Sequence, residues 1–280
     1  PISLTAAKQL QGKELSYNNI NDTNGALEAL KEYGDEPTIV AVKHANPCGI
    51  ASDTTISAAY HKAYEADPTS IYGGIVASNR VIDKATAEEM VQIFLEVVVA
   101  PGFDDDALEV LKAKQKLRLL VLEDIMYREE GYELKKVMGG MLVQERDTKL
   151  YEKLETVTDR APSDKEMEDL LFAWKAVKDT KSNAVTVAKD KCLVANGPGQ
   201  VNRIWPMENC VEHGGERCKG AVLASDAYFP FDDVCTAAAK AGITAIIQPG
   251  GSIRDADSIK VCNENNIAMV FTGMRHFKHS

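Results

Sequence analysis

Short runs of apolar, often β-branched residues recur along this chain, and helix-compatible segments separate them. The runs are apolar at consecutive positions rather than at alternate ones. Strands of this kind are typical of sheets that are covered by helices on both faces. The predicted strands are 38–43, 73–79, 97–102, 118–122, 183–189, 220–226, 245–250 and 268–271.

The predicted strands form a weak internal repeat. Residues 73–79 resemble 220–226, with Ile-Val-Ala-Ser in the first and Val-Leu-Ala-Ser in the second. Two further pairs follow in the same order and at a nearly constant spacing. These are 97–102 with 245–250, both ending in Pro-Gly, and 118–122 with 268–271. Helices are predicted after the first strand of each set, at 85–94 and 232–241.

Strands that alternate with helices indicate βαβ units with a buried, mostly parallel sheet. We therefore expect an α/β protein of two tandem lobes with related topology. The first lobe spans residues 1–158 and the second 159–280. Residues 126–165 are charge-rich and weakly periodic, and we expect them to bridge the lobes at the surface.

Composition narrows the classes of function. The chain has 280 residues, 45% of them hydrophobic, so it can bury a sizeable core. Its net charge of −10 argues against binding to nucleic acid or to an anionic membrane. No stretch approaches the roughly 18 apolar residues of a membrane span, and no secretory signal is visible. The six cysteines lack short paired spacings, which favours reduced thiols in a cytoplasmic protein over disulfides or a metal site.

The most informative segment is 42–49, Val-Lys-His-Ala-Asn-Pro-Cys-Gly. A strand leads directly into Lys43 and His44, and we expect Pro47 and Gly49 to turn the chain. A neighbouring ammonium disfavours the imidazolium form of His44, so a neutral imidazole is available as a general base. Taken alone, the two residues are better explained by an ordinary strand end with a solvated lysine and a hydrogen-bonded histidine.

Two further segments carry candidate polar groups. Asn183 stands at the start of a predicted strand, where its amide can orient a substrate or donate to an oxyanion. The Gly-rich stretch 196–203 ends in Arg203, which is a candidate anion contact, although its spacing is not that of a known phosphate loop. Taken alone, the Asn183 segment is better explained by a turn or cap, and the second segment is a generic Gly-rich loop.

The last two candidates are an aromatic segment after a predicted strand and an arginine near the C-terminus. Residues 225–233 place three aromatic side chains beside acidic ones, a surface that suits a nitrogen heterocycle. Asp232 and Asp233 can also be plain helix N-caps. Arg275 near a predicted sheet end is a candidate phosphate ligand, because a guanidinium binds phosphate oxygens in a fork.

Six motifs together resemble the transformylase portion of the AICAR transformylase/IMP cyclohydrolase family. They occur in one order, and the resemblance runs from about Ala6 to the last residue, including the opening stretch 8–19. The motifs are Lys-His-Ala-Asn-Pro-Cys-Gly (43–49), Lys-Ser-Asn-Ala-Val (181–185), Gly-Pro-Gly-Gln-Val-Asn-Arg (197–203), Ser-Asp-Ala-Tyr-Phe-Pro-Phe-Asp-Asp (225–233), Gln-Pro-Gly-Gly-Ser (248–252) and Thr-Gly-Met-Arg-His-Phe-Lys-His (272–279).

The resemblance implies formyl transfer from 10-formyltetrahydrofolate, as co-substrate, to the 5-amino group of AICAR in purine biosynthesis. It also implies lobes of cytidine-deaminase-like α/β/α topology and a homodimer with shared active sites. It implies no catalytic metal, although some members bind a structural monovalent cation. Lys43, His44 and Asn183 match the catalytic residues. The residues that match substrate contacts are Asn19, Tyr72, Gly73, Arg203, Ile204, Tyr228, Pro230, Asp233, Arg275 and Phe277.

The sequence also departs from the family. An Arg-Tyr-Gly-x-Asn-Pro-His-Gln segment, whose Arg contacts the nucleotide phosphate, does not precede Pro1, and the cyclohydrolase domain is not present. We therefore expect no cyclohydrolase activity and a weakened affinity for AICAR, in a chain that is either cut from a longer one or a reduced homologue. One alternative is a non-catalytic nucleotide- or folate-binding fragment, and another is a chain that needs a separate partner polypeptide. A zinc deaminase fits poorly, because Asn46 stands where that chemistry needs Glu.

Overall fold

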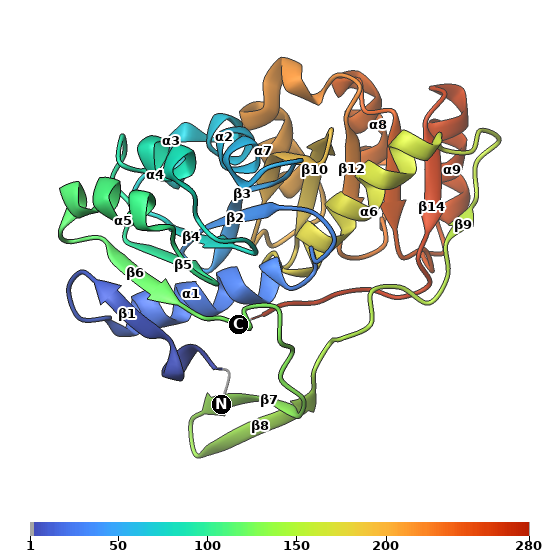
Figure 1. The fold of residues 1–280 in the computed structure, drawn as a ribbon. Helices are drawn as coiled ribbons and strands as arrows, with labels where there is room; N and C mark the ends of the chain where they lie inside the picture. The colour runs from blue at the N-terminus through green and yellow to red at the C-terminus, as the bar shows by residue number, and fades with distance from the viewer. Residues whose placement is uncertain (1–2, 280) are drawn as a thin grey trace.

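The computed structural model describes residues 3–279, and its centre is one twelve-stranded sheet with helices on both faces (Figure 1). The predicted α/β class is confirmed. In spatial order the strands are β1 (Lys8–Gln11), β6 (Arg118–Val121), β5 (Val97–Ala100), β4 (Ile75–Ser78), β2 (Thr38–Lys43), β3 (Asn46–Ser52), β11 (Cys192–Gly197), β10 (Val185–Lys189), β12 (Val222–Ser225), β13 (Ala245–Gln248), β14 (Ala268–Phe271) and β9 (Glu155–Thr156).

The internal repeat appears as two sets of five strands that share one topology. From the middle of the sheet outward, the first set is β3-β2-β4-β5-β6 and the second is β11-β10-β12-β13-β14. In each set the two pairings nearest the middle of the sheet are antiparallel, and the two outer pairings are parallel. The sheet is therefore mixed rather than mostly parallel. β3 meets β11 antiparallel, with Ala51 opposite Cys192, so an approximate twofold axis relates the sets.

Helices α1 and α6 cover one face of the sheet. Val40 and Val42 of β2 point into a core with α1, and this core continues beneath α6 to Trp174. Ile39 and Ala41 point to the other face. The helices are α1 (Tyr17–Leu30) and α6 (Asp164–Lys178) on the first face, and α2 (Ile56–Ala66), α3 (Pro68–Ile71), α4 (Lys84–Met90), α5 (Asp105–Leu111), α7 (Ile204–Gly214), α8 (Asp233–Ala241) and α9 (Asp255–Glu264) on the other.

The N-termini of α1 and α6 are fixed by the same device. Ser16 caps α1 by accepting from the backbone N–H of Asn19, whose side chain accepts in return from the backbone of Ser16. Ser163 and Glu166 form the equivalent capping box at α6. Each box satisfies two backbone donors that a helix start leaves free.

Two local predictions need correction. Pro47 and Gly49 do not turn the chain, because they lie within β3. The turn is made by His44 and Ala45, with φ values of 53° and 59°, the left-handed pair that a two-residue hairpin requires. The helix predicted at 85–94 ends at Met90, whereas the one predicted at 232–241 is present as α8.

Residues 126–165 lie at the surface, as expected, but they also contain strands. β7 (Tyr132–Val137) and β8 (Gly140–Glu145) form a hairpin that projects from the body (Figure 1), and every residue of both strands is exposed. Both faces of this hairpin lie outside the core, so its sequence does not show the alternation that marks a half-buried strand.

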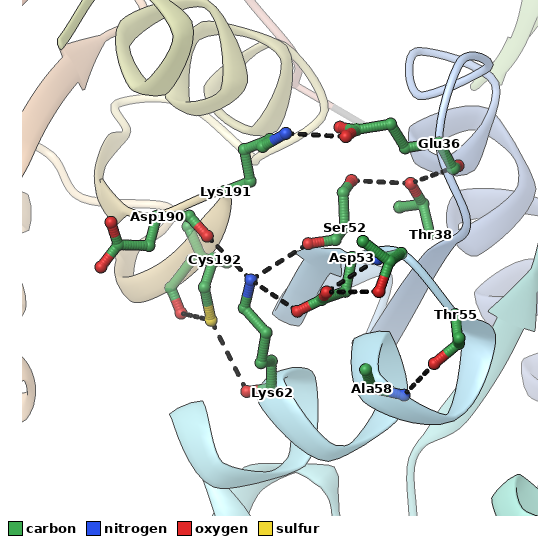
Figure 2. Close-up of polar contacts among 12 residues, drawn as sticks. Glu36, Thr38, Ser52, Asp53, Thr55, Ala58, Lys62, Asp190, Lys191 and Cys192 are labelled. Atoms are coloured by element: carbon green, nitrogen blue, oxygen red, sulfur yellow. Dashed lines mark hydrogen bonds and ion pairs between the residues drawn. The ribbon is translucent and has the colours of Figure 1, made fainter. Parts of the chain in front are cut away.

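On one side of the sheet, at the strand ends where β3 stops and β11 begins, charged side chains link the two repeats (Figure 2). Lys62 of α2 donates to the carbonyl oxygens of Ser52 and Asp190, at 3.1 and 2.9 Å. Lys191 pairs with Glu36 at 2.7 Å. We call this side, formed by residues 36–38, 52–53, 62 and 189–192, the closed edge. The opposite side, where β2, β11, β12 and β14 end and β3, β4 and β10 begin, is the open edge.

Candidate functional site

The open edge collects most of the residues that the sequence singled out. β2 ends there with Lys43, whereas β10 begins there just after Asn183. The approximate twofold axis reverses the direction of each repeated strand, so opposite ends of β2 and β10 face the same side. Asn183 is therefore not the counterpart of Lys43 in the second repeat. The site combines non-equivalent positions of the two repeats.

The β2–β3 turn holds Lys43 and His44. The Lys43 ammonium donates to the carbonyl oxygen of Tyr72 at 2.8 Å, which keeps its side chain beside the start of β4. The backbone N–H of His44 donates to a carboxylate oxygen of Asp22, on α1, at 3.1 Å. The imidazole itself is exposed and makes no hydrogen bond with the described residues.

A direct hydrogen bond joins this turn to the loop that carries Asn183. Oδ1 of Asn46 accepts from the backbone N–H of Lys181 at 3.1 Å, across the boundary between the repeats. Asn183 in turn exchanges two backbone hydrogen bonds with Gln200, both 3.1 Å. The Lys-His pair, the Asn183 loop and the Gly-rich segment are thus held in one network, which sequence spacing alone did not reveal.

Arg203 does not present its guanidinium to solvent. Arg203 is only 7% exposed, and it forms a buried ion pair with Asp226, which is 0% exposed. It also donates to Oδ1 of Asn183 at 2.8 Å and to the carbonyl oxygen of Ala184 at 3.1 Å. The predicted contact between the Arg203 side chain and an anion is therefore not supported by its geometry.

The C-terminal tail runs from β14 across the open edge toward α1 (Figure 1). The backbone N–H of His276 donates to the carbonyl oxygen of Asp226 at 3.0 Å, and Lys278 exchanges hydrogen bonds with Ser182. Arg275, just before the first anchor, is exposed and stacks on Phe277, with its guanidinium carbon 4.6 Å from the ring centre.

Charged groups also fix the end of the tail. The Lys278 ammonium contacts Glu28 at 3.1 Å and Asp179 at 3.2 Å. Burial alone lowers the pKa of Lys278, but the two carboxylates outweigh that effect and raise the pKa. Lys278 therefore stays charged at neutral pH and binds the tail to both repeats.

The other predicted contact residues lie at different depths. Tyr72 is exposed and packs on Phe94, and Gly73 has φ of +73° and donates to the carbonyl oxygen of Phe94. The side-chain oxygen of Asn19 accepts hydrogen bonds from the backbone N–H and the hydroxyl of Ser16 in the α1 cap. The remaining predicted residues, on the segments that follow β12 and open α7 and α8, are Ile204, Tyr228, Pro230 and Asp233.

A cavity of about 610 Å³ lies beside the tail, between α1 and the β7–β8 hairpin. Phe277 and Lys278 line it, with Glu28, Lys178 and Asp179. Lys43, His44 and Asn183 do not line it, so cavity size alone would not have located the candidate chemistry.

Three polar residues that sequence reasoning missed organise the site: Asp22, Asn46 and Asp226. Two of them lie in segments that the sequence singled out, Asn46 in 42–49 and Asp226 in 225–233, whereas no pattern pointed to Asp22. Cys48 also lies in 42–49, but burial raises the pKa of its thiol to about 12. That thiol is therefore protonated at neutral pH and is a poor nucleophile.

No group of three or more His, Cys, Asp or Glu side chains in residues 3–279 is arranged to hold a metal ion. Within the same range, Oδ2 of Asp226 is a buried oxygen without a hydrogen-bond partner, but a single oxygen of a carboxylate that is already paired with Arg203 does not make a cation site. All six cysteines are free thiols. Over that stretch no helix combines the length and the apolar character needed to cross a membrane.

A duplicated α/β sheet with a lysine, a histidine and an asparagine at one edge defines a candidate acid–base site. The chain belongs to the family described as AICARFT/IMPCHase bienzyme, which matches residues 1–213. It is 61% identical over 280 residues to the bifunctional purine biosynthesis protein PurH of Acetivibrio thermocellus. It is 60% identical to PurH of Ruminiclostridium cellulolyticum, and both alignments cover 99% of this chain. The chain spans about half the length of these relatives, 54% of each.

Proposed function

We propose that this chain transfers a formyl group from 10-formyltetrahydrofolate to the 5-amino group of AICAR, a step of purine biosynthesis. The observation that carries the proposal is the hydrogen bond between Asn46 and Lys181, because it joins the Lys43–His44 turn to the loop of Asn183. The match to the AICARFT/IMPCHase bienzyme family supports the choice of this reaction.

The chemistry needs a base, because the AICAR amine is delocalised into its ring and carboxamide and is a poor nucleophile. His44 takes a proton from the amine as the nitrogen attacks the formyl carbon. The resulting tetrahedral oxyanion receives hydrogen bonds from Lys43 and Asn183. The bond from carbon to N10 of the folate then breaks, and the proton held by His44 is delivered to that nitrogen. The products are formyl-AICAR and tetrahydrofolate.

Substrate binding is assigned to the residues around the catalytic group. Arg275 is exposed and oriented by Phe277, which suits a ligand for the nucleotide phosphate. Tyr72 and Gly73 flank Lys43 as further nucleotide contacts. We assign the folate side to the exposed aromatic segment after β12 and to its neighbours, namely Asn19, Arg203 through its backbone, Ile204, Tyr228, Pro230 and Asp233.

We further propose a homodimer that works in the cytoplasm, with the β7–β8 hairpin in the subunit interface. The hairpin exposes a group of apolar side chains that a lone chain leaves in water, which supports a protein partner. These are Tyr132, Leu134, Met138, Met141, Leu142 and Val143. The structural monovalent cation stays a prediction, and the proposed reaction uses no catalytic metal.

The test measures binding and turnover on one sample. Calorimetry with AICAR is paired with a formyl-transfer assay, in which tetrahydrofolate formation is followed in a sample of known oligomeric state. We expect both binding and turnover. Binding without turnover in a dimeric sample would contradict the proposed formyl transfer. It would support the alternative, a non-catalytic nucleotide-binding fragment. Leu142→Asp, which charges the hairpin, is expected to shift the sedimentation of the protein toward the monomer.

A further inference from the structure

The Arg203 side chain lies beneath the open edge, where it cannot reach a ligand but does reach Asn183. Its guanidinium has four acceptors within the protein: Asp226, the carbonyl oxygen of Ala184, the hydroxyl of Ser225 and Oδ1 of Asn183. A guanidinium is a donor only, and its planar fork can serve several acceptors at fixed directions. Arg203 therefore dictates which end of the Asn183 amide faces inward.

This contact removes an ambiguity in the Asn183 side chain. An asparagine amide can present either its oxygen or its NH2 group to a neighbour. Because Nη2 of Arg203 is a donor at 2.8 Å, only Oδ1 of Asn183 can face it. The NH2 group then points away from Arg203, and within residues 3–279 it meets no acceptor. The NH2 group of Asn183 is therefore available to donate to a ligand or to water.

Asp226 holds Arg203 in this orientation. Its Oδ1 accepts both from the guanidinium and from the backbone N–H of Ala184, the latter at 3.2 Å. Its carbonyl oxygen accepts from the backbone N–H of His276 at 3.0 Å. One buried residue thus fixes both the Asn183 amide and the tail between Arg275 and Phe277.

We infer that Arg203 is a positioning residue, which together with Asp226 locks the Asn183 amide with its NH2 group toward the open edge, so that Asn183 acts solely as a hydrogen-bond donor to the reacting oxygen. This inference rests on the proposed function for its catalytic readout. It assigns the Arg203 side chain a place behind the site rather than a contact with substrate.

Asn183→Asp tests the donor without disturbing Arg203. The carboxylate keeps an oxygen for the guanidinium but cannot donate toward the open edge. We expect an unchanged or raised melting temperature and a fall in kcat of about 10²–10³-fold, the usual effect of losing one oxyanion donor. A variant that retains more than about one tenth of kcat would overturn the inference.

A double-mutant cycle tests whether Arg203 acts through Asn183. Lysine at position 203 keeps the charge beside Asp226 but lacks the fork that also reaches Asn183. Arg203→Lys is expected to lower kcat about 10–100-fold with little change in the KM for AICAR, and to have almost no effect when Asn183 is already Ala. An equal loss in both backgrounds would mean a general structural role and would contradict the inference.

An activity-independent readout separates this inference from the proposed function. The side-chain NH2 signals of Asn183, assigned by their loss in Asn183→Ala, are followed by ¹⁵N NMR. We expect two signals, since the amide C–N bond has partial double-bond character, and we expect the chemical shifts of both to change in Arg203→Lys, because the amide oxygen loses its donor and the side chain is released to rotate about Cβ–Cγ. Signals that do not change would overturn the inference even if the enzyme is active. Absence of formyl transfer with the expected spectra would contradict the proposed function alone.

Discussion

The carboxylate of Asp22 accepts a hydrogen bond from the backbone N–H of His44 at 3.1 Å, and this contact sets the β2–β3 turn against α1. The second repeat contains the same arrangement. Asp169, at the matching position of α6, accepts from the backbone N–H groups of Asp190 and Lys191. Identical chemistry therefore supports two tight turns, one at the open edge and one at the closed edge.

This pair of aspartates gives a matched test of where the site lies. Asp22→Ala removes the acceptor behind His44 and is expected to lower kcat about tenfold, with a stability loss of about 1 kcal/mol. Asp169→Ala is expected to cost more stability, because two backbone donors rather than one lose their acceptor, while kcat of the folded protein stays near wild type. Urea denaturation and steady-state kinetics measure the two effects. A larger kcat loss in the Asp169 variant would place the site elsewhere.

His44→Ala is expected to lower turnover about 10²–10⁴-fold, the range for losing a general base, while the Kd for AICAR changes little. The matched control is His61→Ala. His61 is an exposed histidine on α2 that pairs with Glu89 at 3.1 Å, away from the open edge. We expect its removal to leave kcat unchanged. Equal turnover in wild type and His44→Ala would remove the imidazole from the mechanism.

The ion pair between Arg160 and Glu166, at the start of α6, should make the free energy of unfolding depend on pH. Burial raises the pKa of Glu166, but hydrogen bonds from Arg160 and from the backbone of Ser163 outweigh it and lower the pKa to about 2. Because the folded pKa lies below the ordinary value of 4.5, the carboxylate stabilises the fold at pH above that value. This contribution is lost as pH falls from about 5 to 2.

Glu166→Gln should therefore lower the melting temperature at pH 7, and the gap to wild type should close as the pH approaches 2. Thermal scans followed by circular dichroism between pH 2 and 7 measure it. The control is Glu216→Gln, since Glu216 is an exposed glutamate paired with Lys219 on the surface. A gap that stays constant with pH would contradict an electrostatic origin.

Gly49 is required by close packing in β3. A Cβ at this position would lie 2.7 Å from the carbonyl oxygen of Ala63 on α2, closer than atoms of those types approach. Gly49→Ala is expected to destabilise the protein by about 1–3 kcal/mol. Gly140→Ala, in β8, is the control, because within residues 3–279 no atom beyond Gly140 and its two chain neighbours lies within 4 Å of the place that its methyl group would take. Denaturant midpoints that agree for both variants would refute the packing argument.

The sequence contained enough to predict the repeated strands, because each is a continuous apolar run buried on both faces. β3 and β11 were missed for a physical reason. Pro47, Gly49 and Gly197 are turn-forming residues in most contexts, but here close approach to helices requires small side chains. For Gly197 a Cβ would lie 2.2 Å from the carbonyl oxygen of Pro206.

The candidate site was only partly accessible to sequence reasoning. Lys43, His44 and Asn183 stood out because of the segments around them, and the structure brings those segments together. The Arg203 side chain looked like an anion contact because a Gly-rich loop precedes it. Its burial depends on Asp226, which follows a strand in a different part of the chain. Partnership between residues so distant in sequence is a property of the fold and leaves no local pattern.

The approximate twofold axis gives the sheet two edges of the same design, each with a left-handed hairpin turn supported by a helix aspartate. In a dimer of identical single lobes, any substitution at one edge would appear at both. Once both copies lie on one chain, each edge can diverge alone. His44 occupies the turn at the open edge. At the closed edge the turn consists of Asp190 and Lys191, which contact Lys62 and Glu36 of the first repeat. The duplication therefore allows the candidate catalytic residues to lie on one side of the sheet only.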